Sequence, residues 1–521
     1  MPRIVWALAC LALTAQAPAP PPPAAETIGS ILTARKIVLR HLGVRDHKRL
    51  EASGLLTGLN LQGSFHTWQA GERERSDENL GIRSQTVLRS GEREFIINSS
   101  GNVRRLHGLL VRRQRSEDFI ESADFLDRPE YSTLVSRVTL PSGAEAFDIA
   151  VSPPGGQPLN VDIDAKTLMI DRLAYVDSDA LTTIDYSNYK SISGALIPFA
   201  EVTSDGNHQY DITQITTDVR VDKPIDESVF AVPKTTQIET DKPITIPIRE
   251  RRGHLYAAVS LRGRTYDFLI DTGSQGIVVD SRIAGDTLLL PQGSLEVSGA
   301  RRTGGLGLAS LDSVQIGGAR LPVKVVSVLD LTSATGGTME IDGILGYPFF
   351  AAAEVRIDPV AMTMTFSRPG MLPPGKEKFD VDVDRELPEV LASVDGTEGR
   401  FLIDTGNGNE LLIFHRFAQA HPGRIPYAGK SPTSNFGVGG STQAVSATIS
   451  ELDLGPFRLF NRRGNIMLTD TGAFADQFDA GNIGLPVLRN FTTTFDLANE
   501  AMYLERGSNF DDGRYRTVTE P

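Results

Sequence analysis

Two aspartates occupy the same place in two copies of one hexapeptide. The sequence Phe-Leu-Ile-Asp-Thr-Gly stands at residues 268–273 and returns at residues 401–406. In each copy the short apolar run predicts a buried strand, and the glycine after Asp-Thr permits a sharp turn of the backbone. Asp271 and Asp404 therefore each stand where a strand meets a turn. Two such carboxyl groups, if they meet, can perform general acid and base chemistry.

The similarity between the two copies extends beyond the hexapeptide. The two aspartates are 404 − 271 = 133 residues apart, and Gly317 and Gly455 are 455 − 317 = 138 residues apart. Gly346 is matched by Gly484 at the same offset of 138. Such self-similarity indicates a repeated structural unit. We therefore predict two related lobes, each carrying one of the aspartates.

A third Asp-Thr-Gly stands at residues 470–472 and calls for another interpretation of the motif, as an ordinary turn. Asp-Thr-Gly is common in turns, where Asp caps its own backbone and Gly adopts a positive φ. The third copy lacks the preceding Phe-Leu-Ile run, so we predict an ordinary loop there. Two copies at equivalent places of two similar lobes favour a catalytic pair instead.

At these residues a family resemblance becomes visible. Asp-Thr-Gly-Ser at residues 271–274, followed by Ile-Leu-Gly at 344–346, resembles a lobe of the retropepsin-like and pepsin-like aspartic proteases. The second lobe repeats the pattern at residues 404–406 and 482–484. The resemblance covers residues 245–506 and implies two retropepsin-like β lobes in one pepsin-like bilobed body. It implies that Asp271 and Asp404 are catalytic and that the following residues support the two loops: Thr272, Gly273, Ser274, Thr405, Gly406 and Asn407.

The same resemblance implies an aspartic-type peptidase, a hydrolase that cuts a polypeptide substrate with water activated between the two carboxyl groups. It implies no metal and no other cofactor, and we expect a monomer. Two residues of the second lobe depart from the family pattern: Asn407 stands where Ser or Ala is usual, and Asn482 where an apolar residue is usual. A non-catalytic exported protein that binds peptides or lipids on the same fold is therefore the alternative.

Each lobe also contains a glycine-rich segment between its aspartate and its later strands. In the family a mobile hairpin at this place folds over the substrate, and glycines make such a hairpin deformable. The candidate flap residues are Gly304 and Gly305 in the first lobe and Gly439 and Gly440 in the second. An ordinary surface hairpin is the other interpretation.

Residues 1–25 have the pattern of a Sec-type signal peptide followed by a leader rich in Pro and Ala. Arg3 precedes an apolar run that is too short to span a bilayer, and Ala15-Gln16-Ala17 resembles a cleavage site. Cys10, the only cysteine, lies inside this run. Its neighbours fit a lipoprotein signal poorly, so we prefer a plain secretory signal. We expect a periplasmic or secreted protein without disulfide bonds.

Residues 26–235 predict an α+β domain with an antiparallel half-barrel. Apolar residues at helical spacing from Ile28 indicate a helix that ends near Gly43, and short β-type runs follow at residues 94–98, 145–151 and 159–164. Residues 223–233 resemble the end of periplasmic lipoprotein-carrier-like half-barrels. That resemblance implies a hydrophobic ligand, for which Phe65 and Trp68 are candidate lining residues.

The predicted order is thus a half-barrel at 26–235, a linker at 236–246, protease lobes at 247–370 and 371–506, and a tail at 507–521. The fold class is mainly β. The formal charge of 52 − 65 = −13 gives no indication of nucleic-acid binding. The sequence contains no His-Glu-x-x-His, phosphate-binding glycine loop or Gly-x-Ser-x-Gly motif. Chemistry on two carboxyl groups is what remains.

Overall fold

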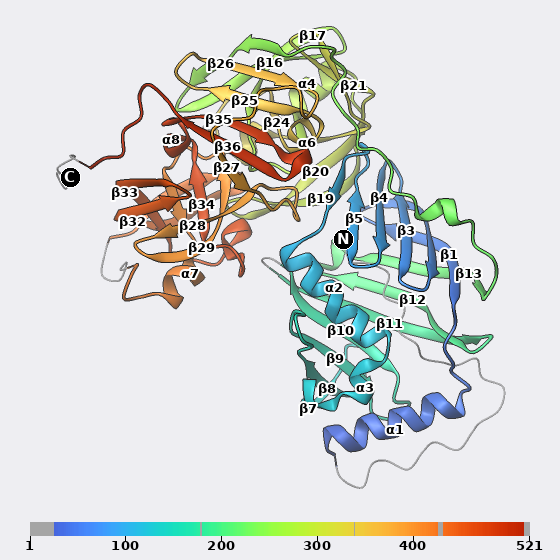
Figure 1. Ribbon diagram of the computed structural model, residues 1–521. Helices are drawn as coiled ribbons and strands as arrows, with labels where there is room; N and C mark the ends of the chain where they lie inside the picture. Colours follow the sequence, from blue (N-terminus) through green and yellow to red (C-terminus); the bar gives the residue numbers. More distant parts are fainter. Residues whose placement is uncertain (1–25, 178–179, 338, 426–430, 515–521) are drawn as a thin grey trace. The chain divides into compact units, whose positions relative to one another are not determined.

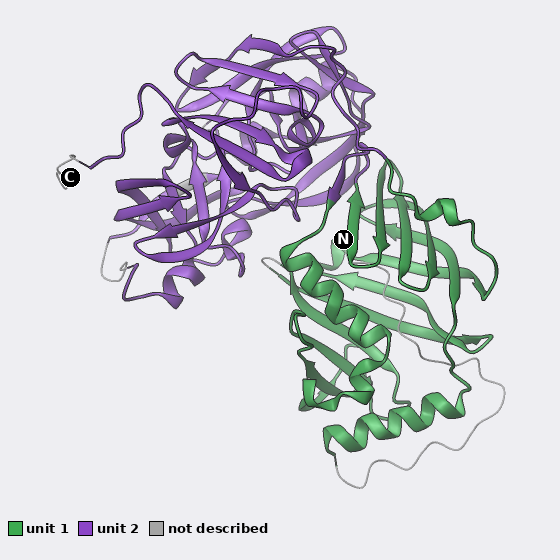
Figure 2. Ribbon diagram, viewed as in Figure 1, with its two compact units in different colours: residues 1–97, 105–233 green, residues 98–104, 234–521 purple. Residues whose placement is uncertain are grey.

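The computed structural model describes residues 26–177, 180–337, 339–425 and 431–514. It is mainly β and divides into two compact units (Figures 1 and 2). Unit 1 comprises residues 1–97 and 105–233, and unit 2 comprises residues 98–104 and 234–521. Residues 98–104, which we expected in the half-barrel, thus belong to the second unit. The chain passes from one unit to the other three times.

Unit 1 is built on a 13-stranded sheet in the order β6-β5-β4-β3-β2-β1-β13-β12-β11-β10-β9-β8-β7, of which only residues 103 and 104 of β6 are grouped with unit 2. Its strands are β1 (Arg49–Gly58), β2 (Leu61–Ala70), β3 (Arg73–Leu80), β4 (Arg83–Ser90), β5 (Arg93–Ile97), β6 (Val103–Arg105), β7 (Ser132–Thr139), β8 (Glu145–Val151), β9 (Leu159–Asp164), β10 (Ile170–Asp177), β11 (Ala180–Ile192), β12 (Ala195–Ser204) and β13 (Ile212–Val221). The sheet curves in Figure 1 and forms the predicted half-barrel. The expected strands at 94–98, 145–151 and 159–164 correspond to β5, β8 and β9.

Three helices of unit 1 pack against the β7–β12 half of this sheet: α1 (Ile28–His41), α2 (Gly108–Glu121) and α3 (Asp124–Asp127). Thr27 is the N-cap residue of α1, and its hydroxyl accepts from the Ser30 N–H in a capping box. Ile31, Leu32, Val38 and Leu39 are its buried apolar residues, which confirms the predicted helix. Short 3₁₀ turns are η1 (Pro129–Tyr131), η2 (His208–Tyr210) and η3 (Glu227–Phe230).

Unit 2 contains the two predicted lobes, each with its own sheet. The first sheet has the order β19-β20-β23-β18-β24-β17-β16-β21-β22, with β15 paired to β16. Its elements are β15 (Arg249–Arg251), β16 (His254–Leu261), β17 (Arg264–Ile270), β18 (Ile277–Asp280), α4 (Ser281–Asp286), β19 (Gln292–Ser298), β20 (Arg302–Ser310), β21 (Ser313–Ile316), β22 (Ala319–Pro322), β23 (Val325–Leu329), α5 (Leu331–Ala334), β24 (Gly343–Leu345) and α6 (Tyr347–Ala352).

The second sheet repeats this arrangement in the order β28-β29-β34-β30-β33-β32-β31. Its elements are β28 (Glu389–Val394), β29 (Thr397–Asp404), β30 (Leu411–Ile413), α7 (His415–Ala420), β31 (Thr433–Gly437), β32 (Gly440–Leu454), β33 (Phe457–Met467), η4 (Gly472–Ala475), β34 (Gly481–Gly484) and α8 (Leu485–Leu488). In both lobes the strand that leads to the aspartate pairs in parallel with a short strand, β24 just before Gly346 in the first lobe and β34 up to Gly484 in the second.

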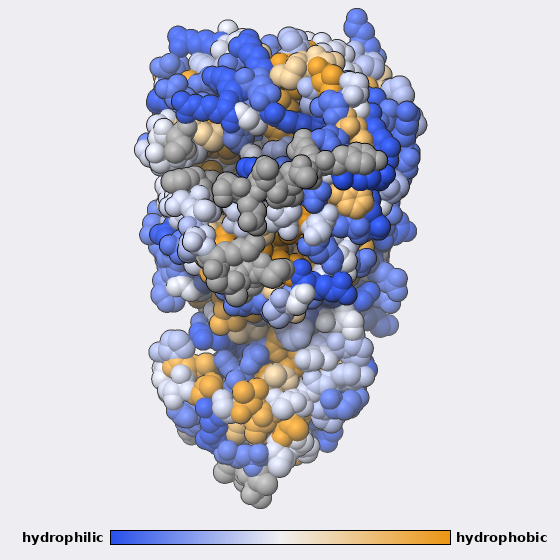
Figure 3. Space-filling view, turned by 90° about the vertical axis from the view of Figure 1, so that its left-hand side faces the viewer, coloured by the Kyte–Doolittle hydropathy of each residue, from blue (hydrophilic) through white to orange (hydrophobic). Residues whose placement is uncertain are grey.

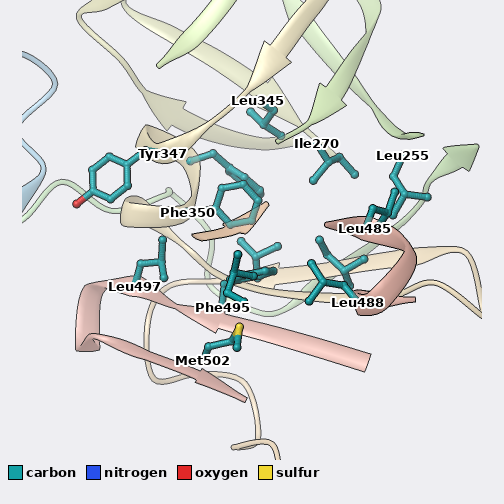
Figure 4. Close-up of a cluster of buried hydrophobic side chains, with 14 of the residues drawn as sticks. Leu255, Ile270, Leu345, Tyr347, Phe350, Leu485, Leu488, Phe495, Leu497 and Met502 are labelled. Carbon is teal, nitrogen blue, oxygen red and sulfur yellow. The ribbon is translucent and has the colours of Figure 1, made fainter. Parts of the chain in front are cut away.

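A six-stranded sheet joins the lobes in the order β14-β26-β25-β35-β36-β27. It consists of β14 (Ile244–Pro247), β25 (Glu354–Asp358), β26 (Thr363–Ser367), β27 (Glu377–Asp380), β35 (Phe491–Asp496) and β36 (Ala501–Arg506), with η5 (Leu497–Asn499) before β36. Strand β25 of the first lobe pairs with β35 of the second. Figure 4 shows the apolar core above this sheet, where Phe350 meets Phe495 edge to face at 5.4 Å. One continuous core thus holds the two lobes together.

The segment that we expected to be a linker is part of the folded body of unit 2. Ile238 is fully buried, its N–H donates to the Ala352 carbonyl at 2.9 Å, and Glu239 bridges to Arg320. Ile244 begins β14 and pairs with Phe366. Turn-forming residues predicted the absence of regular structure here, but the apolar residues between them are drawn into the core. The start of the tail also packs, since Phe510 contacts the same core.

Hydrophilic residues cover most of the face drawn in Figure 3, and the apolar residues on it lie in separate groups. Among the described residues, no helix is long and apolar enough to cross a membrane. Residues 1–25, with the predicted signal peptide and leader, lie outside the described part of the chain.

Candidate active site

The two aspartates stand at the ends of equivalent strands. Phe268, Leu269 and Ile270 of β17 pair in parallel with the three residues of β24, and Phe401 to Asp404 of β29 pair with β34 in the same way. The apolar-apolar-Gly segments therefore lie directly beside the strands that carry the aspartates. The two lobes share this local arrangement.

Glycine is required at the ends of β24 and β34. A Cβ at Gly346 would come within 2.3 Å of the Gly276 carbonyl oxygen, and a Cβ at Gly484 within 1.9 Å of the Asn409 carbonyl oxygen. Contacts this short exclude any side chain without a shift of the backbone. Each Asp-Thr-Gly loop is thus seated against the bare backbone of the segment behind it.

Two threonines lock the loops to each other across the joint between the lobes. The Thr272 N–H donates to Thr405 Oγ1 at 3.0 Å, and the Thr405 N–H donates to Thr272 Oγ1 at 3.0 Å. The Thr272 hydroxyl donates in turn to the Ile403 carbonyl at 2.6 Å, and the Thr405 hydroxyl to the Ile270 carbonyl at 2.9 Å. Both threonines are buried, with 1% of their surface exposed. The four bonds form an approximately two-fold symmetric clamp.

The clamp brings the two carboxyl groups together at the centre of unit 2. A Cβ at Gly273 would lie 2.5 Å from Asp404 Cγ, and a Cβ at Gly406 would lie 2.3 Å from Asp271 Cγ. Each carboxyl group therefore rests against the glycine of the opposite loop. The Gly273 N–H donates to Asp271 Oδ1 and the Gly406 N–H to Asp404 Oδ1, both at 2.8 Å.

The electrostatics of the pair favour one proton between two carboxyl groups. Burial raises the pKa of Asp271 well above its ordinary value, and both the charge of Asp404 and a hydrogen bond to its carboxyl group raise it further. The Gly273 N–H opposes this rise in pKa. Asp271 therefore holds a proton at a pH at which an exposed aspartate is ionised.

The two departures of the second lobe lie directly at Asp404. Asn482 Nδ2 donates to Asp404 Oδ2 at 2.6 Å, and the Asn407 N–H donates to Asp404 Oδ1 at 3.0 Å. The Asn407 side chain contacts Asn482 through a bond of 3.0 Å from Nδ2 to Oδ1. In the first lobe the Ser274 hydroxyl donates instead to the Gly276 carbonyl at 3.1 Å. The surroundings of the two aspartates are thus not symmetric.

The candidate flaps are two hairpins whose tips meet. The first tip lies at residues 299–301, between β19 and β20, so Gly304 and Gly305 lie within β20 and not at the turn. In the second hairpin Gly439 lies in the turn and Gly440 begins β32. The Arg301 N–H donates to the Val438 carbonyl at 3.3 Å, and the Gly439 N–H to the Ala334 carbonyl at 2.9 Å. The first bond joins the two hairpin tips, and the second joins the second tip to the end of α5.

The third Asp-Thr-Gly is a loop outside the carboxyl pair, as predicted. Asp470 Oδ1 shares a hydrogen bond with His415 Nδ1 at 3.1 Å, and Asp470 forms an ion pair with Arg416 at 3.4 Å. The loop also supports the first hairpin tip, because the Ala473 N–H donates to the Gly299 carbonyl at 2.9 Å. Sequence reasoning gave no indication of this second contact.

Sequence reasoning also missed His254, at the start of β16. Its ring lies against the second Asp-Thr-Gly loop, since a Cβ at Gly408 would be 3.3 Å from His254 Cε1. Burial lowers the pKa of His254, while a hydrogen bond to the Gly406 backbone and the charge of Asp404 oppose that change. A single histidine in a strand carries no motif, so only the packing of the lobes reveals it.

Phe65 and Trp68 of unit 1 do not line one surface. Phe65 is buried, whereas Trp68, three residues later, lies on the opposite side of β2 and stacks on His66 at 3.7 Å. The face that carries Phe65 also carries Glu78, directly opposite Phe65 on β3. Burial raises the pKa of Glu78 to about 7 and that of the nearby Glu201 well above its usual range. This face is therefore not uniformly apolar, and the hydrophobic ligand stays a prediction.

Residues 257–349 match the family model described as aspartyl protease. This match spans β16 to the start of α6 and includes Asp271 and its loop. No curated protein matches the chain at a significant level of similarity.

Solved structures similar to this chain include two aspartic proteases and a LolA superfamily protein. A retropepsin-like aspartic protease from Rickettsia conorii is 18% identical, with 24% of this chain and 87% of that chain covered and a TM-score of 0.20. An aspartic proteinase from Irpex lacteus is 13% identical, with 51% and 98% covered and a TM-score of 0.33. A LolA superfamily protein from Nitrosomonas europaea is 14% identical, with 40% and 98% covered and a TM-score of 0.29.

Proposed function

We propose that this protein is an aspartic endopeptidase that hydrolyses peptide bonds with a water molecule held between Asp271 and Asp404. The observation that carries the proposal is the clamp of Thr272 and Thr405, which brings the two carboxyl groups against each other across the joint of the lobes. Two buried carboxyl groups so close share one proton and titrate as a unit. This is the protonation state that acid–base hydrolysis of a peptide bond requires.

In the proposed reaction one carboxylate takes a proton from the water, whose oxygen attacks the peptide carbonyl carbon. The protonated carboxyl group donates to the carbonyl oxygen as negative charge develops there, which stabilises the transition state. The hydrated intermediate then returns one proton to the pair and receives one on the peptide nitrogen, and the C–N bond breaks. The pair ends in its starting protonation state, and no covalent intermediate forms.

An extended polypeptide is the proposed substrate. The hairpins β19–β20 and β31–β32 contact each other through the Arg301 N–H and the Val438 carbonyl, and we propose that they cover the substrate. Strand edges of this kind bind extended peptides by main-chain hydrogen bonds. We further propose export to the periplasm or the medium, on the basis of the signal-like residues 1–25, and activity as a monomer.

The Asp271→Asn and Asp404→Asn variants test the proposal in the full chain. Each is expected to lose cleavage of an unfolded protein substrate by at least about a thousandfold, because the amide is nearly isosteric but cannot share the proton. Asp470→Asn is the matched control, since it alters the same motif outside the pair and should keep activity. Near-full activity in either single variant would overturn the paired mechanism.

Mixing the two inactive variants tests whether the site belongs to one chain. A site built within one monomer leaves the mixture as inactive as its components at every protein concentration. Recovery of activity on mixing would show that lobes from different chains combine. An inactive wild-type protein that still binds unfolded polypeptide would favour the non-catalytic alternative.

A further inference from the structure

We propose that Asn482, oriented by Asn407, holds the negative charge of the pair on Asp404 and thereby leaves the shared proton on Asp271. The inference rests on the proposed function, and it assigns distinct roles to the two aspartates. Asn482 is then a positioning residue, because it acts on the peptide only through Asp404.

Asn407 donates to Asn482, which donates to Asp404, and we call these two bonds the asparagine relay. A backbone group sets the direction of both bonds. The Asn409 N–H donates to Asn407 Oδ1 at 2.9 Å, and a backbone N–H can only donate. Asn407 must therefore present its carbonyl oxygen to residue 409 and its amide nitrogen to Asn482. The bond from Asn407 Nδ2 to Asn482 Oδ1 then fixes the second amide. Asn482 has only its Nδ2 group left to face Asp404.

This ordering removes the usual ambiguity in the placement of an asparagine amide. A reversed Asn482 would place its carbonyl oxygen against the Asp404 carboxylate and lose its bond with Asn407. Asn407 and Asn482 are both buried, with 8% and 6% of their surfaces exposed. A buried amide destabilises the folded state unless its polar groups are hydrogen-bonded. The bonds of the relay therefore belong to the folded structure of the second lobe.

The relay makes the hydrogen bonding of the two carboxyl groups unequal. Asp404 accepts from the N–H groups of Gly406 and Asn407 and from Asn482 Nδ2, and the last bond occupies its second oxygen at 2.6 Å. Within the described part of the chain, Asp271 accepts from the Gly273 N–H and shares a hydrogen bond with Asp404. Donors to a carboxylate stabilise its ionised form. The charge therefore belongs on Asp404 and the proton on Asp271.

The first lobe shows what the site is like without the relay. Ile344 stands at the place of Asn482, since 482 − 344 = 138, and both pair with the leucine two residues before the aspartate. An isoleucine can donate nothing to Asp271. The exchange of one buried apolar residue for an amide thus breaks the two-fold symmetry of the pair. In the reaction Asp404 takes the proton from water, and Asp271 donates to the carbonyl oxygen.

Two other titratable groups bear on Asp404 and enter the design of the test. Asp271 faces it from the opposite loop, and His254 faces it from the start of β16. Arg489 acts on His254 from the end of α8. A His254→Gln background therefore separates the effect of the relay from the titration of the histidine.

The test is the pH dependence of kcat/KM for Asn482→Ile, which installs the residue of the first lobe. Loss of a hydrogen bond to a buried charge should move the acid limb upward by about 1–2 pH units. Asn407→Ser, which frees Asn482 to turn, should move it in the same direction by less. Both shifts should persist in the His254→Gln background. A uniform loss of activity with the acid limb in place would show a merely structural role and overturn the inference.

A direct readout keeps the inference testable without turnover. In protein labelled with ¹³C at the aspartate carboxyl carbons, the signal that disappears in Asp404→Asn belongs to that residue. The midpoint of the pair that this signal reports should move to higher pH in Asn482→Ile. An unchanged midpoint would overturn the relay whether or not the enzyme is active. An inactive wild-type protein with the expected midpoint shift would instead refute the proposed function alone.

Discussion

At the scale of single residues, the cross-lobe clamp couples stability to the placement of the carboxyl groups. Thr272→Val keeps the shape of the side chain but leaves the Ile403 carbonyl and the Thr405 N–H without their partner. We expect a loss of about 2–6 kcal/mol in the free energy of unfolding of unit 2, from two buried groups at about 1–3 kcal/mol each. Urea unfolding measures it, together with kcat, which should fall at least tenfold.

Thr272→Ser is the matched control because it keeps the hydroxyl. It should retain most of the stability and activity that the valine variant loses. Thr405→Val should reproduce the effect of Thr272→Val, because the bonds of the two threonines are reciprocal. A stable and active valine variant would mean that packing alone positions the loops.

The raised pKa of Asp271 predicts two pH effects of definite sign. Peptidase activity should fall at high pH as Asp271 loses its proton, and at low pH as both carboxyl groups become protonated, which gives a bell-shaped profile. The stability of unit 2 should also fall as pH rises from the unfolded pKa of aspartate through the raised folded pKa, because the folded state holds that proton more tightly. Asp271→Asn should weaken this fall in the melting temperature as the pH rises above about 4. A rate that rises steadily across this range, or equal pH dependence of both melting curves, would contradict the assignment.

The residues that sequence could and could not identify differ in a physical way. Asp271 and Asp404 were predictable because an internal repeat places them, and Ile28 to Leu39 because a helix repeats every 3.6 residues. The reciprocal bonds of Thr272 and Thr405 depend on how two lobes 133 residues apart pack. His254 depends on the same packing. No local pattern encodes either contact.

At the scale of elements, hairpin registers were the least predictable feature. Ser298 of β19 pairs with Arg302 of β20, so the tip falls at residues 299–301 and not at the glycines that follow. Phe65 and Trp68 are a different case, because the alternation of side chains along a strand already places residues three apart on opposite faces. The error there lay in ignoring a local rule.

The contact between the hairpin tips gives a prediction with a close control. A Cβ at Gly439 would come within 2.2 Å of the Arg301 carbonyl oxygen, whereas a Cβ at Gly440 would have nothing within 4 Å. Both glycines have a positive φ, so the alanine variants share the backbone strain and differ in the clash. Gly439→Ala should lower kcat/KM by about tenfold or more relative to Gly440→Ala, because the tips no longer close over the substrate.

Amide hydrogen exchange reports the same contact without catalysis. The Arg301 N–H, which donates to the Val438 carbonyl, should exchange faster in Gly439→Ala than in Gly440→Ala. Equal exchange and equal kcat/KM in the two variants would show that the tips act independently of each other.

At the scale of the whole molecule, unit 2 includes a segment that the sequence order places within the half-barrel. Residues 98–104 leave the half-barrel sequence and join unit 2, where Arg104 forms an ion pair with Glu386 at 2.6 Å and donates to the Asp384 carbonyl. The Thr236 N–H donates to the Gly101 carbonyl in the same unit. The protease-like lobes are therefore built from two separate stretches of chain, and removal of the first unit also removes part of the second.

Two truncated proteins test how much of the expected linker the lobes need. A protein of residues 234–521 keeps Ile238 and Ile244, whereas one of residues 245–521 loses both, although each keeps Asp271 and Asp404. Removing a fully buried isoleucine costs about 2–5 kcal/mol, and the edge strand β14 is shortened as well. At about 2–4 °C per kcal/mol, the longer protein should melt roughly 4–20 °C higher. Equal melting temperatures would mean that residues 234–244 cover the lobes without stabilising them. A full-length Arg104→Met variant with the melting temperature of the wild type would lead to the same conclusion for residues 98–104.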